Sequence, residues 1–310
     1  MALGHGPNVP GVRPIWKARY ALVLALLLIA GCGGDGGERA AAPEGRFDAE
    51  RSFDDLRAQV EIGPRPAGSA ASARLTRALA AKLEAAGVED VRIQAPLRNV
   101  VGTIPGAEDG YVVVGAHHDT KDDVGPDFVG ANDGASGVAV VLELARSLEP
   151  PLDGPSIAIA LFDAEEARGD RPFTEDGTRG SRQYVRYAEA GGRQASPPLS
   201  ELRAMVLFDL VGDCDLQLPR EANSDPALYG LFAEAAGGAP FEGESGPVAD
   251  DHVPFLEAGI PAVDLIDFTY GPGGTPGAWW HTPEDTLDKV CPESLDAVGE
   301  AAAIAVPQIR

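Results

Sequence analysis

A pattern of buried strand, polar loop and helix at residues 111–148 most constrains how this 310-residue chain can fold. Residues 111–114 form an apolar run, and residues 138–148 repeat apolar side chains at helical spacing. The loop between them, residues 115–137, contains two adjacent histidines and several aspartates. Since ligands bind at the carboxyl ends of strands in open α/β sheets, this loop is either a metal site or a solvated acidic turn.

Strands and helices alternate along the rest of the chain. Besides residues 111–116, apolar or alternating runs predict strands at residues 88–94, 99–104, 157–162, 204–208 and 262–266. Helical spacing predicts helices at residues 47–62, 70–86, 138–148, 182–190, 226–236, 250–256 and 292–309. This alternation is typical of a largely parallel sheet that helices cover on both faces, so we predict one α/β domain over residues 46–310.

The chain is acidic, with a formal net charge of −23 at pH 7. A protein that binds nucleic acid needs a basic surface against the phosphates, and no such footprint is visible in the sequence. We therefore predict that nucleic acid is not a partner.

Residues 1–31 are organised like a signal peptide. Basic residues precede an apolar run at residues 20–30 that is too short to cross a bilayer. The run ends in the sequence LIAGC, which resembles a bacterial lipoprotein signal with Cys32 as the lipidated residue; the alternative is an ordinary secretory peptide with an incidental cysteine. Residues 32–45 are rich in glycine, alanine and charge, which predicts a flexible tether. We expect a lipid-anchored protein of the bacterial cell envelope, outside the cytoplasm.

Two further cysteines, Cys214 and Cys291, follow in the predicted domain. In an oxidising compartment they could form a disulfide, but two buried free thiols fit the sequence equally well.

Acidic residues and histidines stand at the ends of three predicted strands and in two loops. The candidate ligands among them are His117, Asp133, Glu166, Asp209 and His281. Imidazole nitrogen and carboxylate oxygen together suit zinc. The set contains no thiol, which argues against an iron–sulfur cluster or a cysteine-rich structural zinc site.

The adjacent pair Glu165 and Glu166 suggests a division of roles. Because neighbouring side chains point in different directions, one carboxylate can bind a metal while the other serves as a general acid/base. The alternative is two surface glutamates at a helix N-terminus. Asp119, two residues after His117, could hydrogen-bond the imidazole ring or cap a turn.

Six motifs carry a resemblance to a known family. In order, they are HHD at residues 117–119, GANDGASG at 130–137, DAEE at 163–166, FDLVG at 208–212, ADDHVPFL at 249–256 and WHTPEDT at 280–286. Their order and spacing resemble the zinc aminopeptidase and glutaminyl cyclase superfamily over about residues 52–290. The resemblance implies a three-layer α/β/α sandwich with a central mixed, mostly parallel sheet.

The resemblance also implies roles for the candidate residues. The five candidate ligands would occupy the metal positions, with Asp133 shared between two ions and Glu165 as the acid/base. In the aminopeptidases two zinc ions share a hydroxide that attacks a peptide bond. In the cyclases one zinc ion is held at the positions of Asp133, Glu166 and His281, and Asp209 and Asp250 would be hydrogen-bonded acids beside the catalytic glutamate.

Local sequence favours the cyclases. Residues 128–131 and Trp280, directly before His281, match their pattern, and Trp280 could form a wall of the substrate pocket or be a core aromatic. The cysteine pair of animal cyclases is absent, since Ala116 and Val138 stand there.

We predict a glutaminyl-peptide cyclotransferase that acts on peptide or protein N-termini, with one zinc ion. The alternative is an aminopeptidase with two zinc ions, and a third interpretation is a non-catalytic binding domain.

Overall fold

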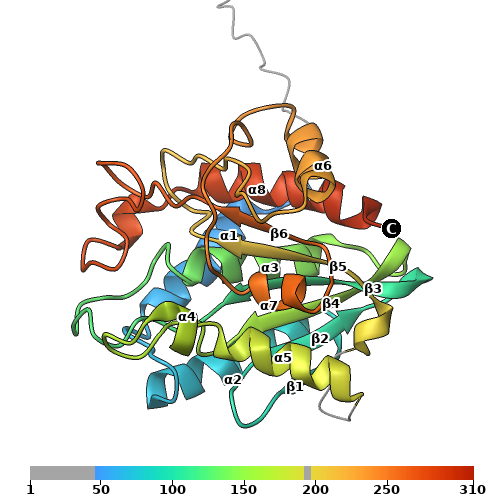
Figure 1. Ribbon diagram of the computed structural model, residues 1–310, viewed down its shortest axis with the longest axis horizontal. Helices are drawn as coiled ribbons and strands as arrows, with labels where there is room; N and C mark the ends of the chain where they lie inside the picture. The colour runs from blue at the N-terminus through green and yellow to red at the C-terminus, as the bar shows by residue number, and fades with distance from the viewer. Residues whose placement is uncertain (1–45, 192–196) are drawn as a thin grey trace, which may run out of the picture. The chain divides into compact units, whose positions relative to one another are not determined.

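A mixed six-stranded sheet forms the centre of the protein in a computed structural model, which describes residues 46–191 and 197–310 (Figure 1). The predicted signal peptide, the tether and Cys32 lie outside the described residues. The strands are β1 (Glu89–Ile93), β2 (Val100–Ile104), β3 (Gly106–His117), β4 (Leu152–Phe162), β5 (Leu202–Asp209) and β6 (Ala262–Ile266).

The sheet has the strand order β1-β2-β4-β3-β5-β6. Strands β4, β3, β5 and β6 are parallel to one another, whereas β2 is antiparallel to both β1 and β4. The carboxyl ends of β3, β4 and β5 therefore meet at one edge, which is where ligands bind in sheets of this kind.

Helices cover both faces of the sheet. The helices are α1 (Ala49–Val60), α2 (Ala70–Ala85), α3 (Ala135–Ser147), α4 (Phe173–Asp176), α5 (Arg179–Ala190), α6 (Pro226–Ala236), α7 (Val253–Glu257) and α8 (Pro292–Ala305), with short 3₁₀ turns at Leu199–Glu201, Leu287–Lys289 and Val306–Gln308. Apolar residues of α1, α2, α3, α6 and α8 share one core with the sheet, and those of α5 and α7 share the other. The predicted α/β/α sandwich is confirmed.

Strand β3 shows why this sheet must lie between two layers. Val112 and Val114 belong to one core and Val113 to the other, so consecutive side chains enter opposite apolar layers. A strand that is buried on both faces appears in the sequence as a continuous apolar run, as residues 111–114 do.

Two strands begin earlier than predicted. Strands β3 and β4 start at Gly106 and Leu152 and pair from that point, although the apolar runs begin only at residues 111 and 157. The additional residues of β3 are exposed or partly exposed, and those of β4 include polar Asp153 and Ser156 next to glycine and proline. Backbone pairing with the neighbouring strand holds them extended. Because they form no continuous or alternating apolar run, periodicity in the sequence did not predict them as strand.

The C-terminal helix is shorter than predicted. It ends at Ala305, and a 3₁₀ turn that contains Pro307 follows. Proline lacks the N–H that a helix interior requires. Among the described residues, no helix has both the length and the apolar composition needed to span a membrane.

Candidate metal centre

Each predicted ligand lies at or near the carboxyl edge of the sheet. His117 and Asp209 are the last residues of β3 and β5, and Glu166 follows β4. Asp133 directly precedes the first turn of α3, and His281 lies in the loop after β6. The fold thus gathers five residues that the chain separates by up to 164 positions, because parallel strands end at a common edge.

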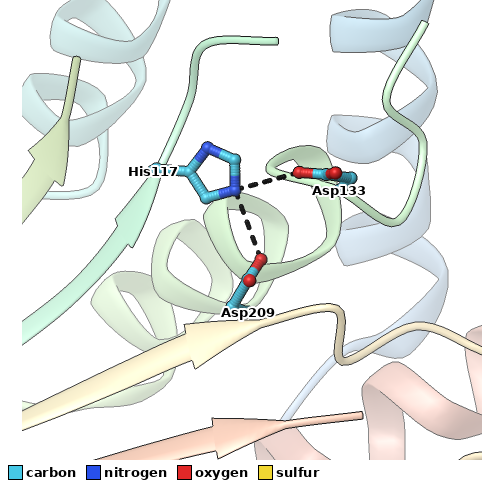
Figure 2. A group of neighbouring side chains, drawn as sticks. All are labelled: His117, Asp133 and Asp209. Carbon is cyan, nitrogen blue, oxygen red and sulfur yellow. Dashed lines mark hydrogen bonds and ion pairs between the residues drawn. The ribbon is translucent and has the colours of Figure 1, made fainter. Parts of the chain in front are cut away.

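The ligands form two groups that share Asp133. In the first, His117 Nε2 lies 3.2 Å from Asp133 Oδ1 and 3.3 Å from Asp209 Oδ1 (Figure 2). In the second, His281 Nε2 lies 3.3 Å from Asp133 Oδ2 and 3.0 Å from Glu166 Oε1. Each oxygen of Asp133 therefore faces a different group, which is the arrangement that a bridging ligand requires.

The donor set fits a divalent cation. Asp133 and Glu166 are buried, and Asp133 Oδ2 accepts no hydrogen bond from the described residues. Burial, together with the charge of the Asp133 carboxylate, raises the pKa of Glu166 to about 7, so carboxylates crowd one another here. A cation would neutralise this charge, and the mixture of imidazole nitrogen and carboxylate oxygen is one that zinc accepts.

The second histidine ligand has a strained backbone. His281 has a φ of +52°, in the left-handed region that residues other than glycine rarely adopt. Its imidazole stacks on the Trp280 ring at a centroid distance of 3.8 Å, and Phe268 meets Trp280 edge-on at 5.1 Å. Such strain persists where the surrounding packing enforces it, and it is common at ligand sites.

A cavity of about 340 Å³ opens beside the ligands. Its lining residues include the carboxyls of Glu165, Asp209 and Asp250 and the aromatic side chains of Phe173, Phe268 and Trp280. Burial raises the pKa of Glu165 and of Asp250 well above the usual range of carboxyls. A carboxyl with a raised pKa can donate as well as accept a proton near neutral pH. The cavity thus combines metal ligands, an acid/base and a small, partly apolar space.

Asp119 contacts the glutamate pair more closely than it contacts His117. Its carboxylate accepts hydrogen bonds from the backbone N–H groups of Glu165 at 3.0 Å and Glu166 at 3.3 Å. Its Oδ1 lies 3.7 Å from His117 Nδ1, which is long for a hydrogen bond. His118 lies away from the ligands, with its ring nitrogen 3.2 Å from the Arg98 carbonyl oxygen.

Two buried residues near the ligands were not among the predicted site residues. The guanidinium of Arg65 is fully buried and donates to the carbonyl oxygens of His118, Val129 and Gly130, so it joins the two ligand loops. Asp285 accepts hydrogen bonds from the backbone of the Asp133 loop. Asp285 stands in the WHTPEDT motif, but nothing in the sequence shows which backbone it contacts.

A second buried acidic group contacts a residue that lines the cavity. His252, two residues after Asp250, lies between Glu221 and Asp264, with Nε2 and Nδ1 at 3.5 Å and 3.6 Å from their carboxylates. All three side chains are fully buried. Glu221 also accepts a hydrogen bond from the backbone of Val248, which lines the cavity, so this group supports the wall that carries Asp250.

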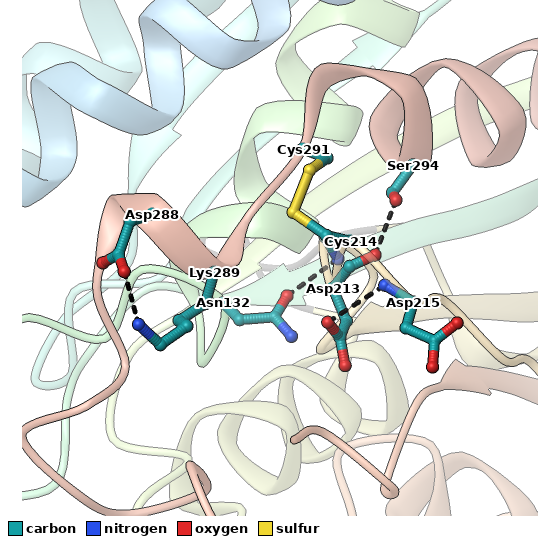
Figure 3. Close-up of a disulfide and its surroundings, with 9 residues drawn as sticks. Asn132, Asp213, Cys214, Asp215, Asp288, Lys289, Cys291 and Ser294 are labelled. Carbon is teal, nitrogen blue, oxygen red and sulfur yellow. Dashed lines mark hydrogen bonds and ion pairs between the residues drawn. A yellow bond between two sulfur atoms is a disulfide. The ribbon is translucent and has the colours of Figure 1, made fainter. Parts of the chain in front are cut away.

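A disulfide joins Cys214 and Cys291 beside the ligand loops (Figure 3). It connects the segment after β5 to the start of α8, and hydrogen bonds from Cys214 N to the Lys289 oxygen and from Cys291 N to the Gly212 oxygen flank it. Gly212 N also donates to the Asn132 side chain at 2.7 Å, next to Asp133. The structure therefore has a disulfide here and not two free thiols, which were the two alternatives that the sequence left open.

The model of "Peptidase family M28" matches residues 99–306, which include every residue of the two ligand groups. The chain belongs to peptidase family M28. Within this family it is similar to the crystal structure of a glutaminyl cyclase from an Acidobacteriales bacterium, with 31% identity and a TM-score of 0.75 over 87% of this chain and 97% of that one.

Two curated relatives carry different names. A glutaminyl-peptide cyclotransferase of the snake Boiga irregularis is 27% identical over 243 residues, which are 67% of this chain and 64% of the snake protein. Aminopeptidase YwaD of Bacillus subtilis is 30% identical over 204 residues, 63% of this chain and 40% of that protein. The chain thus spans less than two thirds of the length of each.

Proposed function

We propose that this M28 protein is a zinc-dependent glutaminyl-peptide cyclotransferase, which converts N-terminal glutamine to pyroglutamate and releases ammonia. One observation carries the proposal: Asp250 shares a small cavity with Glu165 and Asp209 beside the Asp133, Glu166 and His281 group. Burial and then the charge of Asp209 raise the pKa of Asp250, so these two carboxyls lie close to each other. Their proximity favours Asp209 as an acid beside the catalytic glutamate, which leaves one complete group for a metal ion. The likeness to named glutaminyl cyclases supports the same activity.

Cyclisation forms a bond between the α-amino nitrogen of the substrate and its γ-carboxamide carbon, and it breaks the bond from that carbon to the amide nitrogen. A zinc ion held by Asp133, Glu166 and His281 would supply Lewis acidity to the carboxamide oxygen. Glu165 accepts a proton from the attacking amine and donates it to the departing nitrogen, which leaves as ammonia.

The cavity contributes by orienting one residue of the substrate. Both reacting groups belong to the same glutamine, so the ring closes only when its side chain folds back on its amine. Trp280 and Phe268, whose rings meet edge-on, offer an apolar surface to the methylene groups of that side chain. Holding the folded conformer lowers the entropic part of the barrier.

The alternative is an aminopeptidase with two zinc ions. The observation in its favour is the second ligand group, because His117, Asp133 and Asp209 also converge with their ligand atoms within 4.8 Å of one another. The likeness to aminopeptidase YwaD agrees with it.

One experiment separates the two activities. The soluble protein from about residue 40 is incubated with a peptide that begins with glutamine and with a leucine-initiated chromogenic amide. We expect ammonia and a pyroglutamyl peptide from the first substrate and no release from the second. Free amino acid from either substrate, without ring closure, would show an aminopeptidase instead.

The identity of the metal is a further part of the proposal. We expect the purified protein to contain zinc, and we expect a chelator to abolish turnover until zinc is restored. Metal analysis that found one ion per chain would support the cyclase, and two ions would support the aminopeptidase. A protein without metal whose properties did not respond to a chelator would support a binding domain.

We also propose that a lipid on Cys32 anchors the domain in the bacterial envelope, outside the cytoplasm. The support is the resemblance of residues 28–32 to a lipoprotein signal. The Cys214–Cys291 disulfide agrees with this location, because structural disulfides persist in oxidising compartments.

A further inference from the structure

The Asp285 carboxylate contacts the loop that carries the shared ligand. Asp285 Oδ1 accepts a hydrogen bond from Asn132 N at 2.7 Å, and Oδ2 accepts one from Asp133 N at 3.1 Å. The Tyr270 hydroxyl donates to Oδ1 at 2.7 Å. Asp285 and Tyr270 are both fully buried, so water does not compete for these contacts.

The position of this loop decides whether the two ligand groups can form. Each oxygen of Asp133 faces a different histidine, so a rotation of its backbone would move both oxygens at once. The loop has no regular structure, and Gly134 next to it has a φ of +87°. The N–H groups of residues 132 and 133 precede the first turn of α3, so no carbonyl group within the helix is available to accept their hydrogen bonds. Asp285 supplies the acceptors that they lack.

Asp285 also links two candidate-ligand segments that are far apart in the sequence. It lies four residues after His281 and belongs to the same loop, so its contacts tie the segment of one ligand to the backbone of another. Tyr270 in turn stands at the start of that loop, after β6, and its hydroxyl orients the carboxylate. A carboxylate held by three donors has one orientation in which all of them are satisfied.

We propose that Asp285, oriented by Tyr270, is a positioning residue that presets the backbone of Asp133 for metal binding. This inference rests on the metal centre of the proposed function. Contacts of this kind around a ligand usually change metal affinity on the order of 10–100-fold when they are removed.

The test is the zinc affinity of Asp285→Asn, measured by competition with a chromophoric chelator. An asparagine has one acceptor oxygen and turns an NH₂ group toward the other backbone N–H, so it cannot satisfy both. We expect the zinc dissociation constant to rise about 10–100-fold. Tyr270→Phe should raise it less, because both backbone contacts remain.

Asp267→Asn is a matched control. Asp267 is also fully buried and accepts hydrogen bonds from two backbone N–H groups, of Gln217 and Thr269, and from the Thr269 hydroxyl, but neither donor residue is a candidate ligand or stands next to one in the chain. We expect this variant to lose thermal stability and to keep its zinc affinity. An affinity equal to the native value in Asp285→Asn, with a loss of stability like that of the control, would overturn the inference.

Three further outcomes are informative. Should Asp285→Asn fail to fold, Tyr270→Phe decides: a native zinc affinity in that variant counts against the inference, and a weakened one supports it. A native protein that binds no zinc would overturn the proposed metal centre together with this inference. A native protein that binds zinc but does not cyclise glutamine would overturn the activity alone.

Discussion

Asp133 and Glu165 have different surroundings although both are buried carboxylates in one site, so we propose different tasks for them. Asp133 faces both histidines, and its charge is needed to hold a metal. Glu165 lies in the cavity, where burial raises its pKa, so it suits proton transfer. The neighbouring Glu166 points to His281 instead, as expected for two consecutive residues.

Replacing Glu165 with glutamine should abolish turnover and keep the metal. The amide has nearly the same shape but cannot carry a proton between the amine and the departing nitrogen, and general acid/base catalysis is typically worth about 10²–10⁴-fold in rate. Metal analysis and kcat on a glutamine-initiated peptide measure the two properties. Asp133→Ala is the contrasting variant and should lose the metal itself. A near-native kcat in Glu165→Gln would show that another group transfers the proton.

At the scale of elements, loops that join strand ends to helices build the site. The segment after β5 and the start of α8 lie far apart in the chain, and the Cys214–Cys291 disulfide closes 77 residues between them. The segment after Glu166 is held by Asp176 in α4, which accepts hydrogen bonds from Arg168 and pairs with Arg171 at 3.3 Å. Beyond the strand ends, where backbone pairing stops, a disulfide and ion pairs therefore hold these loops in place.

Removing the disulfide in the double variant Cys214→Ala/Cys291→Ala should lower the free energy of unfolding by about 2–5 kcal/mol. Its closed loop is long, so the unfolded chain gains much freedom when it opens. Urea denaturation measures the change. Reduced native protein should match the double variant, and an unchanged free energy would mean that hydrogen bonds alone hold these segments.

The contacts of Asp176 predict that the stability of the fold depends on pH. The hydrogen bonds from Arg168 hold the pKa of Asp176 well below its usual range, so the carboxylate stabilises the fold at neutral pH. Its contribution is present above the unfolded pKa of about 4 and is lost as the pH falls toward the lower folded pKa. Asp176→Asn should therefore be less stable than the native protein at neutral pH, and the difference should shrink in acid. Urea denaturation at a series of pH values measures it; a difference that is independent of pH would contradict the assignment.

For the whole molecule, the proposal to test is the lipid anchor on Cys32. Cys32→Ser should move the protein from the membrane fraction to the soluble envelope fraction, because a serine hydroxyl cannot receive the lipid through a thioether. Fractionation of a bacterial host followed by immunoblotting measures this. Gly33→Ala serves as the control and should stay with the membranes. An unchanged distribution of Cys32→Ser would rule out the lipid on this residue as the anchor.

The sequence by itself determined the layered α/β architecture and singled out the candidate ligands. Val112, Val113 and Val114 must all be buried, which requires layers on both faces of the sheet. Residues such as His117 and Asp209 end apolar runs, and parallel strands bring such ends to one edge. Both inferences depend on local patterns, which the chain displays directly.

Only the tertiary structure decided which groups contact one another across the chain. It paired Cys214 with Cys291 and turned Asp119 toward the backbone of Glu165 and Glu166. It also placed Asp285 against the loop of Asp133. These contacts depend on how the loops pack in three dimensions. The sequence around a polar loop residue has no periodic pattern from which its partner could be predicted.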